Sequence, residues 1–264
     1  MSDIITDAQL LEQFAAKAME EPATVIKTRA PSESEVKLPG GYIDLSGELH
    51  TTAEVRELTG ADEEAVAKAG STGKALNVLL SKGLVKIGPN QATSADLDAL
   101  LSGDRDAILL GIRRVTFGQT TEFMVRCSYC SDEHTTTLDL LNDVPTTSLD
   151  KPEEDRTWKM ETKLGTAVVA LPNGITQKRL MENYDKTSAE LNTLLLSGCI
   201  ISIAGSPSVG ASTALSLGMA DRTKIVEEII KRNPGPRLGE VKKSCEACGE
   251  DIPMPLTLAT LFRV

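Results

Sequence analysis

The chain has 264 residues, of which 41% are hydrophobic, so it can bury a substantial core in one large domain or in two of ordinary size. Its 38 acidic residues outnumber 28 basic ones and give a net charge of −10, which disfavours a protein that binds the phosphate backbone through Lys and Arg. The acidic start lacks the features of a signal peptide, and the most apolar stretch, Leu194 to Gly205, is far shorter than the roughly 20 residues that span a bilayer. We therefore expect a protein of a reducing cytoplasm that is not inserted in a membrane.

Residues 1–37 are predicted to form an N-terminal arm. After Thr6 and Asp7, apolar residues recur at helical spacing and Pro22 follows the expected end; the apolar positions are Leu10, Leu11, Phe14, Ala18 and Met19. A polar, proline-containing stretch from Pro22 to Lys37 separates this amphipathic helix from the body. The helix suits docking on another subunit or packing back on its own domain, and the pattern leaves both open.

Residues 38–141 predict a first unit of mixed short strands and helices. The glycines after Leu38 favour a turn before a short strand, and the Asp104-Arg-Asp sequence is expected to open a helix with one buried face. Further strands are expected at 51–58, 84–87 and 121–125, and helices at 61–68, with a capping box from Thr59 to Asp62, and at 74–81.

Residues 142–157 contain two prolines in a polar, charged run and predict a connector. Trp158 opens the following unit, residues 158–264, and is expected to pack at a strand start. Cys199 lies in an apolar strand and is expected to be a small buried hydrophobe. The stretch from Gly205 to Ser212 has the glycine spacing of a phosphate-binding loop, but Ala211 replaces the required Lys, so nucleotide binding is not expected.

The two units share an ordered series of matching residues. The offset between matches rises from 114 residues at Gly60 and Gly174 (174 − 60) to 118 at Cys127 and Cys245 (245 − 127). Loop insertions of one or two residues would produce such a drift. The sequence therefore predicts an α+β fold of two tandem repeats, each of which ends in a Cys-x-x-Cys hairpin.

Four of the five cysteines form two equally spaced pairs, Cys127 with Cys130 and Cys245 with Cys248. Two thiolates separated by two residues can bind one ion, and two such pairs are typical of a structural tetrathiolate zinc site. Because each repeat supplies only two thiolates, we expect one shared, zinc-ribbon-like site with approximate twofold symmetry that joins the repeats. Disulfides remain an alternative, as does a layout in which other ligands, such as His134, complete each pair.

The sequence offers no catalytic constellation. With only His50 and His134 in the chain, no Ser/His/Asp, Cys/His or metal-hydrolase group can be assembled. Asp104-Arg105 and its match Asp221-Arg222 are interpreted as helix caps followed by surface or interface pairs, and His134 as a solvated strand residue. We therefore expect a protein that is not an enzyme.

Several segments together resemble a known family. They are Leu38-Pro-Gly-Gly-Tyr, Glu57-Leu-Thr-Gly-Ala-Asp-Glu-Glu64, Asn77-Val-Leu-Leu, Ser102-Gly-Asp-Arg-Asp-Ala-Ile-Leu-Leu-Gly-Ile-Arg113 and Phe117-Gly, followed by the first Cys-x-x-Cys hairpin. From about residue 38 onward the chain resembles the T-even-type baseplate hub and assembly proteins of contractile-tailed bacteriophages. The resemblance implies a non-enzymatic protein of the virion tail baseplate, assembled in the host cytoplasm with other tail proteins as partners.

Three functions follow as hypotheses. The first is a structural or assembly protein of the baseplate hub or wedge, with structural Zn²⁺ on Cys127, Cys130, Cys245 and Cys248, a docking N-terminal arm and a place in a symmetric multi-subunit assembly. A tail assembly chaperone that is absent from the mature virion is the second. The third is a zinc-ribbon regulator that binds nucleic acid, which the acidic residues around the cysteine pairs disfavour. A thiol-disulfide exchanger would instead need an exposed thiol of low pKa.

Overall fold

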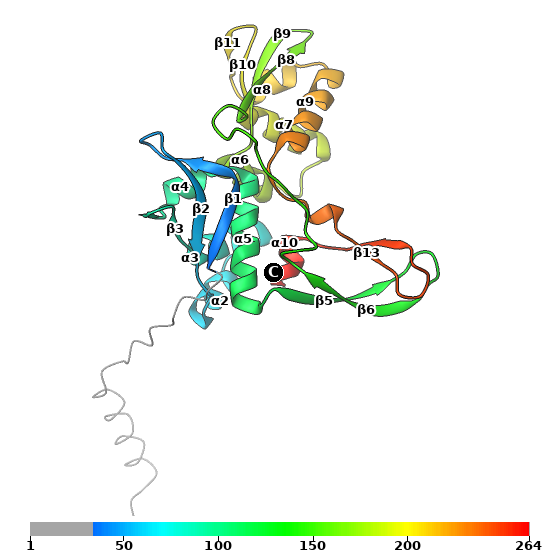
Figure 1. Cartoon of the computed structure of the whole chain (residues 1–264). Helices are drawn as coiled ribbons and strands as arrows, with labels where there is room; N and C mark the ends of the chain where they lie inside the picture. Colours follow the sequence, from blue (N-terminus) through cyan, green and yellow to red (C-terminus); the bar gives the residue numbers. More distant parts are fainter. Residues whose placement is uncertain (1–33, 264) are drawn as a thin grey trace, which may run out of the picture. The chain divides into compact units, whose positions relative to one another are not determined.

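The protein is described by a computed structural model that covers residues 34–263 (Figure 1). The predicted N-terminal helix and most of the predicted arm lie outside these residues. The last residues assigned to the arm, Glu35–Lys37, belong instead to the first strand and pair with the second. Within residues 34–263 the fold is α+β, as predicted, with nine α-helices and several small antiparallel sheets.

The first sheet is antiparallel and has the strand order β1-β2-β3-β4. Helix α5 packs against β1 and β2, and its Ile108 and Ile112 are fully buried there, as the sequence predicted. The elements of this part are β1 (Glu35–Ile43), β2 (Leu49–Val55), α2 (Gly60–Ala67), α3 (Thr72–Gly83), β3 (Leu84–Ile87), β4 (Asn90–Gln91), α4 (Ser94–Ala99) and α5 (Ser102–Phe117).

The glycines of β1 do not form the expected turn. The strand continues through Gly40 and Gly41, and its pairing with β2 shifts register at this point, as in a β-bulge. Gly41 adopts a positive φ of 69°, and the backbone N–H of Gly40 donates to Asp104 Oδ1 at 2.7 Å. A glycine inside a strand often marks a close approach by another group, here the buried carboxyl group of Asp104.

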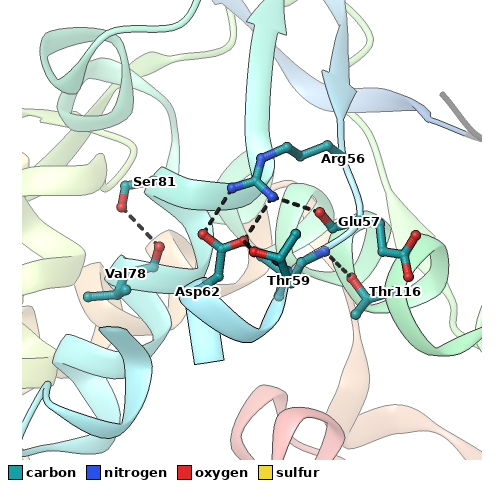
Figure 2. A network of polar contacts seen from close by, with 8 residues as sticks. Arg56, Glu57, Thr59, Asp62, Val78, Ser81 and Thr116 are labelled. Atoms are coloured by element: carbon teal, nitrogen blue, oxygen red, sulfur yellow. Dashed lines mark hydrogen bonds and ion pairs between the residues drawn. The ribbon is translucent and has the colours of Figure 1, made fainter. Parts of the chain in front are cut away.

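The start of α2 confirms the predicted capping box. Asp62 accepts from the backbone N–H of Thr59 at 2.9 Å, and Thr59 is the N-cap residue. The guanidinium of Arg56, at the end of β2, donates to both carboxylate oxygens of Asp62 at 2.8 and 3.0 Å (Figure 2). This charge-assisted, two-pronged contact holds the beginning of α2 against the end of the strand.

The second sheet has the strand order β11-β10-β9-β8. Trp158 packs against its core and lies under the guanidinium of Arg232, 5.0 Å from the ring centroid, so the predicted packing role is confirmed. Cys199 is the last residue of α7 and not a strand residue as predicted, because the strand begins at Ile200. It is fully buried, as expected for a small hydrophobe, and burial raises its pKa to about 12. The elements here are β8 (Thr157–Thr162), β9 (Gly165–Ala170), α6 (Gly174–Glu182), α7 (Ser188–Cys199), β10 (Ile200–Ile203), β11 (Ser206–Pro207), α8 (Ala211–Ser216) and α9 (Met219–Arg232).

Two hairpins complete the described chain and lie side by side in Figure 1. The longer one pairs β5 (Thr120–Arg126) with β6 (Glu133–Asp139), and the shorter pairs β13 (Lys242–Ser244) with β14 (Asp251–Pro253). Their inward-facing apolar residues share one core cluster. The remaining elements are β7 (Thr146–Thr147), which pairs with β12 (Gly235–Pro236), the 3₁₀ turn Leu238–Glu240, and α10 (Leu258–Phe262).

The Asp104-Arg105 pair differs from its prediction. It is neither a helix cap nor a surface pair, because the N-cap is Leu101 and both side chains are at most 2% exposed. Arg105 donates to the carbonyl of Leu97, to Asn77 of α3 and, at 2.6 Å, to Gln177 Oε1 of α6. The arginine therefore joins helices that are far apart in sequence, and such contacts leave no local pattern.

Candidate metal centre

Each cysteine pair occupies the turn of one hairpin. In the first turn the N–H of Cys127 donates to the carbonyl of Asp132, and the N–H of Ser131 donates back to Cys127, both at 2.9 Å. The second turn repeats this arrangement at 2.8 Å, with Cys245 bonded to Glu250 and Gly249. Ser131 and Gly249 both adopt a positive φ, of 63° and 79°, so the two turns have the same local backbone conformation. We call these two cysteine-containing turns the knuckles.

The four sulfurs converge on one point. All four lie within 4.8 Å of one another, and the pairs Cys127–Cys248 and Cys130–Cys245 are each separated by 3.7 Å between Sγ atoms. A disulfide bond would need about 2.05 Å, whereas tetrahedral zinc at about 2.3 Å from each sulfur separates its ligands by about 3.8 Å. The cysteines are free thiols, and their spacing fits one tetrahedral ion.

The surroundings of the sulfurs favour a thiolate at Cys127. The backbone N–H of Cys130, together with that of Tyr129, lowers the pKa of the Cys127 thiol to about 7, against the opposing effect of burial. The N–H of Tyr129 lies 3.4 Å from this sulfur. Cys127 and Cys245 are buried, while Cys130 and Cys248 face solvent, so an ion could enter from the exposed side.

His134 is not the solvated strand residue that the sequence suggested. Only 11% of its side chain is exposed, and its Nδ1 lies 3.1 Å from Asp132 Oδ2. Together with Cys245 these residues form a second group whose possible ligand atoms lie within 4.8 Å of one another. Residues 134, 136 and 138 share the inward face of β6, and this alternation was the signal that could have placed His134 correctly.

The charges near the knuckles are partly paired. Lys243 binds Asp143 at 2.6 Å, and Arg126 approaches Glu133 at 3.8 Å. Because both of these cations have acidic partners, the hairpins do not present the stripe of positive charge expected of a zinc ribbon that binds nucleic acid.

A third group of possible ligands, which the sequence reasoning missed, lies in the turn between β1 and β2. It consists of Asp44, Glu48 and His50. The carboxylate of Asp44 already accepts hydrogen bonds from the N–H groups of Ser46 and Glu48 and lies 3.0 Å from His50 Nε2. These contacts explain the cluster as the closure of a turn.

One family of known proteins matches the chain. The model of the family described as T4 bacteriophage base plate protein matches residues 32–262. No curated protein and no solved structure matches the chain. Among the helices of residues 34–263, none combines the length and the apolarity that a membrane crossing needs. Because the match covers most of the sequence, the chain belongs to the family of T4 bacteriophage base plate proteins.

Proposed function

We propose that the chain is a structural or assembly subunit of the hub or wedge region of a phage tail baseplate, which acts by binding its neighbours and contains a structural zinc ion. The family match over residues 32–262 carries this proposal. Membership implies a structural role in the baseplate, other tail proteins as partners and a location in the virion tail. A non-enzymatic role accords with the family and with the fully protein-ligated centre proposed below.

The four cysteines would hold the zinc as thiolates. The 3.7 Å separations between sulfurs support this assignment, because they suit tetrahedral coordination without rearrangement of the knuckles. Four protein ligands leave no open position on the ion for water or substrate. The metal would therefore be a structural link between the two hairpins.

We further propose that the hairpins end two tandem repeats, residues 38–141 and 158–264, joined by the connector 142–157. In each sheet four strands follow one another in sequence order, with two helices between the second and third strands. The Asp-Arg pairs also make parallel contacts. Arg105 donates to the carbonyl of Leu97 in α4, and Arg222 donates to the carbonyl of Ala214 in α8. These parallels support a duplication followed by divergence.

Protein partners suit this chain better than nucleic acid does. The net charge of −10 repels a phosphate backbone, and Lys243 and Arg126 near the knuckles face acidic side chains. Residues 1–37 are proposed to dock on a neighbouring subunit in a symmetric assembly. Deletion of residues 1–33 should abolish that binding and preserve the fold, since Glu35–Lys37 already belong to β1 and Val36 is buried in the core; unchanged binding would contradict the docking role.

Metal analysis tests the proposed centre. Protein purified without added zinc should contain about one zinc ion per chain, since four thiolates hold one ion. The double variant Cys245→Ser/Cys248→Ser should lose it, while Cys199→Ala, which changes a cysteine far from the site, should retain it. A zinc content near zero with intact thiols would reject the structural zinc.

Mass spectrometry of intact particles tests the location. A permanent subunit should be present at a fixed copy number in purified tails. Presence during assembly but absence from finished particles would instead identify a tail assembly chaperone.

A further inference from the structure

The two proposed repeats contact each other, and each repeat contributes a different surface to this contact. The loop before α5 meets the turn before α6: the N–H of Ser102 donates to the carbonyl of Pro172, and the N–H of Gly174 donates to that of Leu100, both at 2.9 Å. Asn233, after the end of α9, accepts from the hydroxyl of Ser102 at 3.1 Å. The contact is therefore head-to-tail, so each repeat has one surface of this kind that makes no equivalent contact within the chain.

The equivalent surface of the first repeat lines a cavity of about 600 Å³, to which the second repeat adds Phe262 and Arg263 at the end of α10. At the repeat offsets, Pro172, Asn173, Gly174, Gln177, Asn233 and Pro234 correspond to Leu58, Thr59, Gly60, Glu63, Thr116 and Phe117. All six of the corresponding residues line this cavity, with further apolar walls from Val66, Leu79 and Phe262. We call it the socket; Thr59 and Thr116, two of its polar lining residues, are labelled in Figure 2.

The uncovered surface of the second repeat is a pair of exposed apolar side chains. Asp98 and Ser102, which lie at the internal contact, correspond to Leu215 and Met219. Leu215 is 68% exposed and Met219 is 86% exposed, at the end of α8 and the start of α9. We call these two residues the plug.

We propose that the plug of one copy of this chain binds in the socket of a second copy. The inference rests on the duplication proposed above. At the internal contact polar pairs dominate, since Lys178 binds Asp98 and Gln177 donates to Asp106 at 2.8 Å. At the free ends the equivalents of the two acidic residues are Leu215 and Thr223, and the socket offers apolar walls, so apolar burial would replace these pairs.

The contact between copies differs in spacing from the internal one. A side chain at Gly103 would place its Cβ 1.5 Å from the carbonyl oxygen of Pro234, and the equivalent residue of the second repeat is Ala220. The second copy therefore approaches less closely, and the open socket provides room for the long side chain of Met219. A heterologous contact of this kind closes into a ring or extends into a filament, depending on the rotation between copies.

Two variants block the two surfaces separately. Met219→Asp places a charge on the plug, and Gly60→Glu fills the socket at a position where an added Cβ meets no atom within 4 Å. Both residues begin a helix, where an acidic side chain is favourable, so both variants should fold. Met124→Asp, at an 81% exposed methionine of β5, and Gly239→Glu, at another open glycine, are the matched controls.

Sedimentation of the full chain over a range of concentrations tests the proposal. The native chain and both controls should form species larger than the 28.2 kDa monomer, and each blocking variant alone should remain at that mass. An equimolar mixture of the two blocking variants should give a dimer that grows no further, because it contains one intact plug and one intact socket. A monomeric native chain at all concentrations, or a mixture that stays monomeric, would overturn the inference.

Zinc measured on the same samples separates this inference from the proposed metal centre. A monomer that contains zinc rejects only the contact between copies. Association without zinc rejects only the metal. If the socket binds a different tail protein while the native chain itself stays monomeric, the proposal of a second copy is wrong.

Discussion

Helix α5 follows the four strands of the first sheet in the chain, and α9 follows the four strands of the second sheet, yet the environments of the two helices differ. Along α5 even Arg105 is buried, and the helix contacts the first sheet, α3, α6 and β12. α9 is amphipathic, with Ile225 and Ile229 buried and Met219 exposed. Glycines explain part of this difference: Gly103 and Gly111 let Pro234 and Val36 approach α5, while Ala220 and Glu228 stand at the equivalent positions of α9. Helix α5 is therefore a central helix of the described residues, whereas α9 begins with an exposed residue.

Removal of the proposed zinc ion should have the largest effect and should act on both hairpins alike. A structural zinc site contributes on the order of 10 kcal/mol to folding, so chelation should separate the hairpins while the two sheets keep their secondary structure. Circular dichroism with and without a chelator measures the secondary structure that remains and the melting temperature. An unchanged melting curve for protein that had contained zinc would contradict the linking role.

The difference in packing between α5 and α9 can be tested at Gly103. In Gly103→Ala the new Cβ would lie 1.5 Å from a backbone oxygen, so the chain must move, and we expect a loss of about 3 kcal/mol or more in unfolding free energy. The reverse change in α9, Ala220→Gly, should cost about 1 kcal/mol or less, the ordinary helix penalty. Urea denaturation of both variants measures the contrast, and equal losses would show that the two helix starts are packed alike.

Arg105 and Arg222 directly follow Asp104 and Asp221, and removal of Arg105 should cost more stability than removal of Arg222. Arg105→Ala leaves Gln177, Asn77 and the Leu97 carbonyl without their buried donor, and we expect a loss of about 2 to 3 kcal/mol. Arg222→Ala, which removes a more exposed arginine, should cost about 1 kcal/mol. The same denaturation series tests both, and a larger loss at Arg222 would reverse the assignment of α5 as the central helix.

The buried carboxyl of Asp104 should make stability depend on pH. Burial raises its pKa to about 7, so the folded protein holds this proton more tightly than the unfolded chain does. The stabilisation is present below the ordinary pKa of about 4 and is lost as pH rises towards 7, by up to about 1.4 kcal/mol per pH unit. Asp104→Asn should reduce this slope in denaturation curves from pH 4 to 8, and Asp106, whose pKa burial raises to about 6, should supply the slope that remains below pH 6. An unchanged slope would contradict the role of Asp104.

Local patterns predicted much of the fold. The strand β3 was predicted at its observed bounds, and α2 with its capping box was predicted within one residue, because alternation and cap residues act within a few positions. The convergence of the four sulfurs could also be predicted from the sequence, since two matched Cys-x-x-Cys pairs are typical of a shared metal site.

The errors lie where distant residues meet. The bulge at Gly40 depends on Asp104, which is 64 positions away, and the burial of Arg105 depends on Gln177, 72 positions away. Neither leaves a periodic signal. His134 was missed although its inward position follows from the alternation of β6, because a histidine beside threonines was interpreted as solvated.

The pairing of the knuckles has a mechanical consequence. Residues 131–244, between Cys130 and Cys245, contain the whole second sheet and helices α6 to α9. With zinc bound, tension applied between β1 and α10 would pass from one hairpin to the other through metal–sulfur bonds, and the intervening 114 residues (244 − 130) would bear little of it. The second sheet would then stay folded while the rest of the chain is under load.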